Sequence, residues 1–158
     1  MRAADPLAHP EQLIRRVYAY VAYRLGDGPD AEDVTADVFE RAVRYQSSYD
    51  PAKGEPIAWL IGIARRSLHG RTGHETGTAI PDVAAADDVE AETLRRIDLA
   101  AAVQALAPRE RELIALRYGA DLSARQIGEL VEMSTNAVEV ALHRALTRLR
   151  ENIGTEGL

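Results

Sequence analysis

The sequence predicts an all-α protein made of two small helical domains joined by a flexible linker. Apolar residues recur at helical spacing in two separate stretches, 11–68 and 93–149. The stretch between them, 73–92, lacks this periodicity and is rich in Gly, Thr, Ala and Asp, as is typical of a linker. The 158 residues, 46% of them hydrophobic, suffice for two domains because one core needs roughly 50 residues. We therefore expect domains at 1–72 and 93–158, with 73–92 as the linker.

The first domain is predicted to hold three helices around one core. A helix over 11–25 follows Pro10, and its apolar residues lie about one turn apart: Leu13, Ile14, Val17, Tyr18, Val21 and Leu25. The second helix begins near Asp30, a residue suited to the N-cap, and its apolar side carries Ala31, Val34, Val38 and Ala42. Pro56 opens a third helix, whose apolar face consists of Ile57, Leu60, Ile61, Ala64 and Leu68.

The second domain is predicted to end in a helix-turn-helix. One helix runs from Thr93 to Ala107, and Pro108 starts another that continues to about Tyr118. A capping box, Ser123-Ala-Arg-Gln, opens a short helix with Ile127, Leu130 and Val131 inward. Ser134 caps the last helix, which directs inward Val138, Leu142, Ala145, Leu146 and Leu149.

The second helix of a helix-turn-helix presents its first turns to the DNA major groove. The reading positions here are Thr135, Asn136, Glu139, Val140 and His143. An asparagine can pair with an adenine edge, and a glutamate can accept from a cytosine amino group. The backbone amides after Ser134 can hold a phosphate, while Arg144 and Arg148 can reach the flanking DNA backbone. The alternative is a tight helical corner that binds no DNA.

The net charge of −6 comes entirely from the linker. Residues 1–72 carry ten basic and ten acidic side chains, and residues 93–158 carry nine of each. The linker has no Lys or Arg, and its acidic residues are Glu75, Asp82, Asp87, Asp88, Glu90 and Glu92. Neither domain is therefore expected to bind DNA strongly through its net charge alone.

The composition argues against other classes of protein. The chain has no cysteine, four scattered histidines, no Ser-His-Asp spacing and no glycine-rich phosphate loop, so we expect no catalytic residue, no metal and no cofactor. No run approaches the roughly 18 uncharged apolar residues of a membrane span, and the N-terminus lacks a signal-peptide core. We expect a cytoplasmic protein without membrane insertion.

Both halves of the chain carry distinctive motifs. The second half contains Leu106-Ala-Pro-Arg-Glu-Arg-Glu-Leu, Ile127-Gly-Glu-Leu and Leu142-His-Arg-Ala-Leu. The first half contains Asp30-Ala-Glu-Asp-Val-Thr-Ala-Asp-Val-Phe-Glu-Arg-Ala, then Tyr49-Asp-Pro, Ala58-Trp-Leu and Ile63-Ala-Arg. These motifs resemble, in turn, the −35-binding sigma4 domain and the sigma2 domain of extracytoplasmic-function sigma factors, which belong to the sigma-70 family of bacterial RNA polymerase. The resemblance implies that core RNA polymerase and promoter DNA are partners, and makes an anti-sigma factor a further candidate.

The resemblance also implies roles for particular residues. The resemblance assigns polymerase binding to Asp33, Asp37 and Arg41 of the second helix. The alternative is that these residues form a solvated acidic face without a partner. The resemblance assigns binding of the −10 element to Tyr49, Lys53, Trp59, Arg65 and Arg66. A base flipped out of the DNA needs a stacking surface and a cationic rim, which aromatic and basic side chains provide. Trp59 is equally compatible with a core position. Arg66 stands where the family frequently has asparagine.

The reading helix departs from the family pattern of Lys and Arg on the DNA face. Glu132, Glu139 and Ala141 stand there instead, and each lost phosphate contact weakens binding. This leaves open a second hypothesis: a sigma-like decoy or adaptor that binds polymerase or an anti-sigma factor without productive promoter recognition.

In the sigma-factor hypothesis, the linker has to span the distance between the two promoter elements. The resemblance implies −10 and −35 elements about 17 base pairs apart, a distance of about 58 Å at 3.4 Å per pair. Roughly 20 flexible residues span about 25 Å on average, so polymerase has to hold the linker extended. Its acidic side chains suit a basic channel, where they resemble nucleic acid. The acidic linker could also fold back on an arginine-bearing face of the free protein. The alternative is that the linker is only a soluble tether between the domains.

Overall fold

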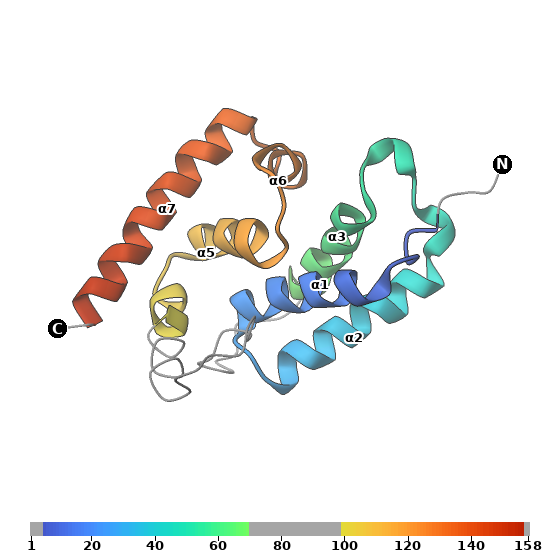
Figure 1. The fold of residues 1–158 in the computed structure, drawn as a ribbon, viewed down its shortest axis with the longest axis horizontal. Helices are drawn as coiled ribbons and strands as arrows, with labels where there is room; N and C mark the ends of the chain where they lie inside the picture. Colours follow the sequence, from blue (N-terminus) through green and yellow to red (C-terminus); the bar gives the residue numbers. More distant parts are fainter. Residues whose placement is uncertain (1–4, 70–98, 157–158) are drawn as a thin grey trace.

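The computed structural model describes residues 5–69 and 99–156, and every regular element in these two ranges is helical (Figure 1). The all-α prediction is therefore confirmed. The predicted linker 73–92, its six acidic residues and the helix start at Thr93 lie outside the described residues. The domain boundaries fall in the same gap and stay predictions.

The first unit contains α1 (Pro10–Leu25), α2 (Pro29–Arg44) and α3 (Pro56–His69), and each begins with a proline in its first turn. Proline favours this position because its fixed φ suits the helix and its missing N–H is not needed there. The N-cap of α2 is Gly28 at φ 145°, so the prediction of Asp30 as N-cap is wrong. Pro29 takes the first helical position, and Asp30 instead places negative charge in the first turn.

Two short 3₁₀ turns connect α2 to α3: η1 (Gln46–Ser48) and η2 (Pro51–Lys53). The Asp50 carboxylate caps η2 by accepting from the Ala52 amide at 2.9 Å. This connection carries Tyr49 and Lys53, and α3 carries the other three predicted −10 residues.

The second unit begins with a helical stretch at 99–104, followed by α5 (Pro108–Ile114), α6 (Ala124–Val131) and α7 (Thr135–Glu156). The helix expected to reach Tyr118 changes character after Ile114, where a wider π turn, η3 (Ala115–Gly119), takes over. Both predicted caps of the helix-turn-helix are present. Ser123 and Gln126 exchange two hydrogen bonds of 2.9 and 3.1 Å, and Ser134 Oγ accepts from the Ala137 amide at 3.1 Å.

A tight turn joins α6 to α7. Glu132 ends α6 in the left-handed conformation, at φ 59°. A Cβ at Gly128 would lie only 2.4 Å from the Met133 carbonyl oxygen, so glycine is the residue that fits this approach. The Met133 amide then donates to the Gly128 carbonyl at 3.0 Å.

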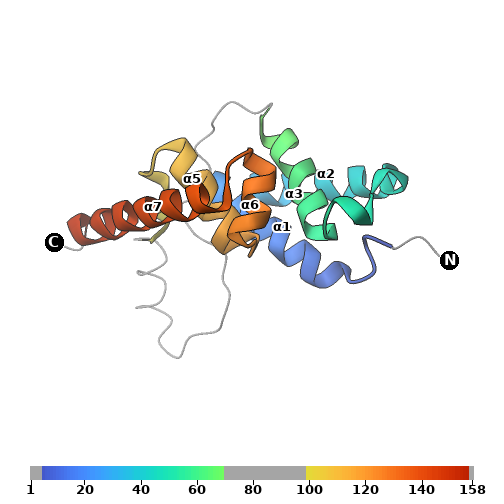
Figure 2. The same cartoon turned by 90° about the horizontal axis from the view of Figure 1, so that it is seen from above.

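The two units pack against each other through α5 and η3, which lie between α7 and α1 (Figures 1 and 2). One continuous apolar cluster joins Val17, Tyr20 and Val21 of α1 to Leu113 and Leu116. Ile114 instead belongs to a second cluster, which includes Ala145 and Leu149 of α7. The helices of the second unit therefore bury apolar side chains both against the first unit and against each other. We call the packing of the two units against each other the closed arrangement.

Candidate polymerase and nucleic-acid interfaces

The predicted polymerase-binding residues lie on the outer face of α2. Asp33 is exposed, and Asp37 Oδ2 lies 3.1 Å from Arg41 Nε, one turn further along. The opposite face of the helix is buried through Ala31, Val34, Val38 and Ala42. The helix therefore presents a charged surface that is anchored from behind by the core.

The predicted −10 residues Tyr49 and Trp59 form an aromatic pair, with ring centroids 5.5 Å apart and planes inclined by 58°. Tyr49 Oη donates to the Gly54 carbonyl at 2.9 Å, and burial raises the pKa of its phenol. Lys53 is exposed beside the pair, while Trp59 also packs partly buried against the core. Both rings line a cavity of about 210 Å³, whose other wall is α6 of the second unit, through Gln126, Glu129 and Leu130.

The adjacent arginines Arg65 and Arg66 have different surroundings. Arg65 Nε donates to Glu112 Oε1 at 2.8 Å, and its Nη1 donates to the Leu130 carbonyl at 2.7 Å. Arg66 is exposed and lines a cavity of about 640 Å³ between the two units. Basic side chains predominate around this cavity: Arg24, Arg65, Arg66, His69 and Arg109. In the closed arrangement Arg65, 33% exposed, is therefore bound to the second unit, whereas Arg66 is exposed beside the cavity.

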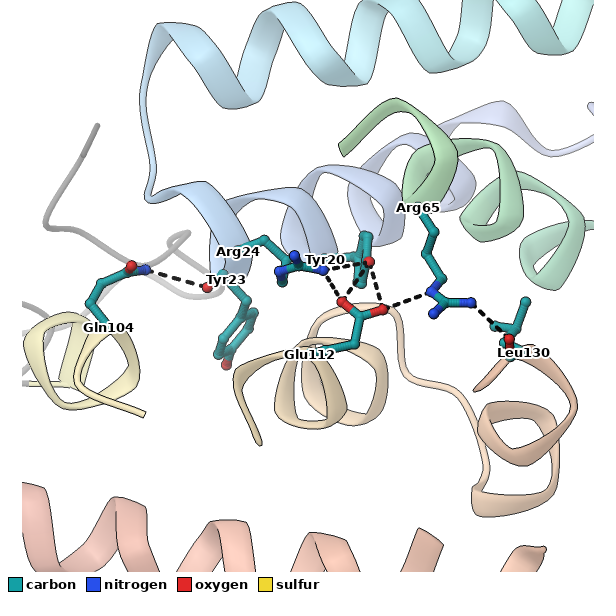
Figure 3. Close-up of polar contacts among 7 residues, drawn as sticks. All are labelled: Tyr20, Tyr23, Arg24, Arg65, Gln104, Glu112 and Leu130. Atoms are coloured by element: carbon teal, nitrogen blue, oxygen red, sulfur yellow. Dashed lines mark hydrogen bonds and ion pairs between the residues drawn. The ribbon is translucent and has the colours of Figure 1, made fainter. Parts of the chain in front are cut away.

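Glu112 of α5 is the centre of the polar contacts between the units (Figure 3). Its carboxylate, 12% exposed, accepts from Arg24 and from Tyr20 Oη at 2.9 and 3.0 Å, in addition to Arg65. Burial raises the pKa of the Tyr20 phenol, and the negative charge of Glu112 raises it further. We refer to Tyr20, Arg24, Arg65 and Glu112 as the Glu112 cluster, which ties α5 to both α1 and α3.

Neither the Glu112 cluster nor the interface around it was expected from the sequence. A signal was present in the run Leu113–Leu116, four consecutive apolar residues that span the end of α5 and the start of η3. A helix that buries a single face has apolar residues at intervals of three and four, so a continuous run indicates burial on more than one side.

The predicted −35 residues lie on α7 and at its cap, and α5 and α6 lie between α7 and the helices of the first unit (Figure 1). The exposed reading positions are Thr135, Asn136, Glu139, Val140 and His143, and Arg144 is exposed beside them. Ser134 Oγ serves as the helix cap. Arg148 Nε lies 3.3 Å from Glu110 Oε2, so this arginine is paired within the unit. Ala141 packs partly buried against the core, which removes it from the DNA face where the sequence had suggested it.

Among the described residues, no group of three or more histidine, aspartate or glutamate side chains is placed to hold a metal ion. Within the same ranges, no helix combines the length and apolarity needed to cross a bilayer.

Comparison with known proteins matches both units. Residues 11–71 match the model of sigma-70 region 2, and residues 96–149 match that of sigma-70, region 4. RNA polymerase sigma factor CarQ of Myxococcus xanthus is 32% identical over 148 residues, covering 88% of this chain and 83% of its own. The ECF RNA polymerase sigma factor BldN of Streptomyces coelicolor is 29% identical, and the match spans 88% of this chain but 56% of BldN.

A likeness to a solved structure extends over the arrangement of helices in both units. The sigma factor RpoE, solved in complex with the anti-sigma factor NepR from Bartonella quintana, superposes with a TM-score of 0.68 at 20% identity. The match covers 90% of this chain and 92% of that one. With both regions present in order and a relative above 30% identity over most of its length, the chain belongs to the extracytoplasmic-function group of the sigma-70 family.

Proposed function

We propose that this protein binds core RNA polymerase and directs transcription initiation at specific promoters, by recognising and melting the −10 element and binding the −35 element. The observation that carries the proposal is the presence of both sigma-70 regions in order on one chain. The protein acts in the cytoplasm, as a regulator without catalysis of its own.

Each surface has a role in this proposal. The acidic face of α2, with Asp33 and Asp37, docks on the polymerase, and the ion pair to Arg41 holds Asp37 in place. The Tyr49–Trp59 pair offers the aromatic surface that an unstacked base needs, and the exposed Arg66 is positioned for a neighbouring phosphate. On α7, Asn136 and Glu139 are positioned to read base edges.

Binding both promoter elements requires the closed arrangement to open. Arg65 Nη1 is 2.7 Å from the Leu130 carbonyl, and the five residues from Leu130 to Thr135 span at most about 18 Å. The nearest −10 and −35 contacts are therefore within about 25 Å of each other, whereas a spacer of about 17 base pairs covers about 58 Å. We infer that the two units separate on the promoter.

Run-off transcription with purified core polymerase and a promoter library tests the proposed function. A sigma factor yields transcripts that start at defined positions and depend on the added protein. A variant carrying both Asp33→Ala and Asp37→Ala should lose transcripts together with polymerase binding. Absence of specific transcripts from the whole library, with the protein bound to polymerase, would reject the proposal.

The same assay addresses a second candidate function, a sigma-like decoy or adaptor. The observation that favours it is the acidic character around the reading helix, where Glu132 closes the turn and Glu139 is exposed on the DNA face. A carboxylate near phosphate adds repulsion in place of a cationic contact. Polymerase binding without transcripts would support this function.

A further inference from the structure

The cavity of about 640 Å³ between the two units has the size of a small-molecule site, for which volumes of about 300–1,000 Å³ are usual. We refer to it as the arginine cavity. Residues of α1 and α3 line it from the first unit, and residues of α5 and α6 line it from the second. Neither unit therefore forms this cavity alone.

Positive charge is in excess around the arginine cavity. Its lining contains the five basic side chains named above and two carboxylates, those of Glu112 and Glu129. Figure 3 shows Arg24 and Arg65 reaching the Glu112 carboxylate from α1 and α3, so this group of three keeps one positive charge. Glu129 is exposed and lies 3.6 Å from Arg125, which is outside the lining. Both carboxylates are thus paired, and arginines remain.

Two of the remaining arginines come from different units. Arg66 belongs to α3 and Arg109 to α5, and both side chains are exposed at the cavity. Within residues 5–69 and 99–156, neither arginine is paired with a carboxylate. Arg109 Nη2 lies 3.0 Å from Met133 Sδ, which is a weak acceptor. Most donors of both guanidinium groups are therefore available to a ligand.

The chemistry of the lining indicates the class of ligand. A cavity with an excess of positive charge concentrates anions, and the planar guanidinium group binds phosphate through two parallel hydrogen bonds. The described lining contains no Phe, Tyr or Trp ring, so it offers no surface that would select a flat apolar molecule. Two arginines on separate units favour a ligand with more than one phosphate group, since each guanidinium can then bind one of them.

We propose that the arginine cavity is a binding site for a small molecule that carries a diphosphate or triphosphate group, held between Arg66 and Arg109. The site itself does not depend on the proposed function. Its consequence for transcription does, because Arg66 is also assigned to the −10 strand. A polyphosphate bound to this guanidinium would compete with the DNA backbone for it.

Isothermal titration calorimetry of the full chain tests the site, with pyrophosphate, ATP and GTP as probes at low salt. Arg66→Ala and Arg109→Ala each remove one proposed phosphate partner. Arg150→Ala is the matched control, because this arginine is exposed on α7 and lies outside the cavity lining. Glu129→Gln removes a negative charge from the lining and keeps the size of the side chain.

We expect the parent to bind one phosphate probe per chain. Arg66→Ala and Arg109→Ala should each weaken binding by about tenfold or more, since each loses charge-assisted hydrogen bonds. Arg150→Ala should stay within about twofold of the parent, because salt screens a distant exposed charge. Glu129→Gln should strengthen binding, a gain that loss of folding cannot produce.

The packing of the two units gives an independent test. A Cβ at Gly119, which is not in the cavity lining, would lie 2.8 Å from the backbone atom Tyr20 Cα of α1. Because the two phosphate-binding arginines belong to different units, Gly119→Ala should weaken binding although every lining side chain is retained. Gly154→Ala is the matched control, since nothing lies within 4 Å of its added Cβ, and it should bind as the parent does.

The probes also distinguish two sources of the phosphate groups. Tighter binding of ATP or GTP than of pyrophosphate supports a nucleotide as the ligand, and equal binding supports recognition of the phosphate groups alone. Absence of binding of all three probes to the parent would overturn the proposal. Equal losses in Arg109→Ala and Arg150→Ala would also overturn it, because they would show attraction to net charge without a site. Calorimetry needs neither polymerase nor DNA, so absence of specific transcripts alongside intact probe binding would contradict the proposed function alone.

Discussion

At the scale of single residues, the largely buried carboxylate of Glu112 accepts hydrogen bonds from three side chains of the first unit. We expect Glu112→Ala to lower the free energy of unfolding by about 2 kcal/mol, because it removes charge-assisted hydrogen bonds and leaves Arg24 and Arg65 without their acceptor. Urea unfolding measures the change. Glu129→Ala, whose carboxylate is exposed, should change stability by less than about 0.5 kcal/mol. Equal effects of the two substitutions would contradict the assigned burial.

Two phenols of α1 predict a loss of stability at alkaline pH. Burial raises the pKa of Tyr18 to about 12 and that of Tyr20 also well above its ordinary value of about 10. Above pH 10 the unfolded chain therefore releases protons that the folded chain retains, so stability falls as pH rises from about 10. Denaturant unfolding between pH 9 and 11 should show this fall, and Tyr20→Phe should make it shallower. A slope that Tyr20→Phe leaves unchanged would contradict the burial of this phenol.

The sequence could not distinguish Arg65 from Arg66. Both are arginines on one helix, and both were assigned to DNA for the same reason. Their difference arises from Glu112 and Leu130, residues more than 40 positions further along the chain. Only the three-dimensional placement of the second unit separates a residue engaged inside the protein from one exposed beside a cavity. Their roles on DNA stay predictions.

At the scale of elements, the turn of the helix-turn-helix depends on Gly128. We expect Gly128→Ala to destabilise the protein by about 2 kcal/mol, since its Cβ would meet a backbone oxygen at 2.4 Å. Gly62→Ala provides the matched control in α3, where the nearest atom is the end of the Arg66 side chain at 3.9 Å. That substitution should stabilise the helix by about 0.5 kcal/mol, because alanine is the better helix former. Thermal unfolding distinguishes the two signs.

Glu132, the left-handed residue at the end of α6, gives a prediction of opposite sign to that for Gly128, because here a change to glycine should stabilise the protein. Glu132→Gly should stabilise the protein by about 0.5–1 kcal/mol, since glycine adopts φ 59° without the steric cost of a Cβ. The same change removes a carboxylate beside the reading helix and should strengthen promoter binding. Glu129→Gly, placed within the helix, should cost about 1 kcal/mol. Calorimetry and filter binding measure the two effects, and a destabilised Glu132→Gly would show that the side chain contributes more than its backbone strain costs.

Elements with local signals were predicted well. Pro10, Pro56 and Pro108 each stand in the first turn of a helix, and Ser123 and Ser134 each act as a cap. Prolines and hydroxyl caps act through backbone groups a few residues away, which is why the sequence reveals them. The π turn of η3 was not foreseen. This segment packs against α1, which lies far earlier in the chain, and a local sequence pattern carries no information on such a contact.

At the scale of the whole molecule, the continuous apolar cluster predicts cooperative unfolding. Trp59 is the only tryptophan and lies in the first unit, so its fluorescence reports that unit, whereas circular dichroism reports the helices of both. We expect the two signals to coincide in the parent protein and to separate in Gly119→Ala, because the added Cβ would lie 2.8 Å from Tyr20 Cα of α1 and weaken the contact between the units. Separate transitions in the parent would show that the shared cluster contributes little to stability.

Two domains were predicted as independent bodies, and the fold class was confirmed, but their association was not foreseen. Contacts such as Gly119 with Tyr20 join residues almost 100 positions apart, and no periodicity encodes them. The run Leu113–Leu116 indicates that α5 has a second buried side, without indicating what covers it.

The close approach of Gly119 to α1 also has a consequence for mutations of its codon. Every missense change in a glycine codon adds a side chain, and at this position any added side chain meets the backbone of α1. Single-base missense mutations there should therefore all act in one direction, toward a protein whose two units pack less tightly. A genetic screen for chains with weakened packing of η3 on α1 should repeatedly recover this codon, with alanine among the substitutions.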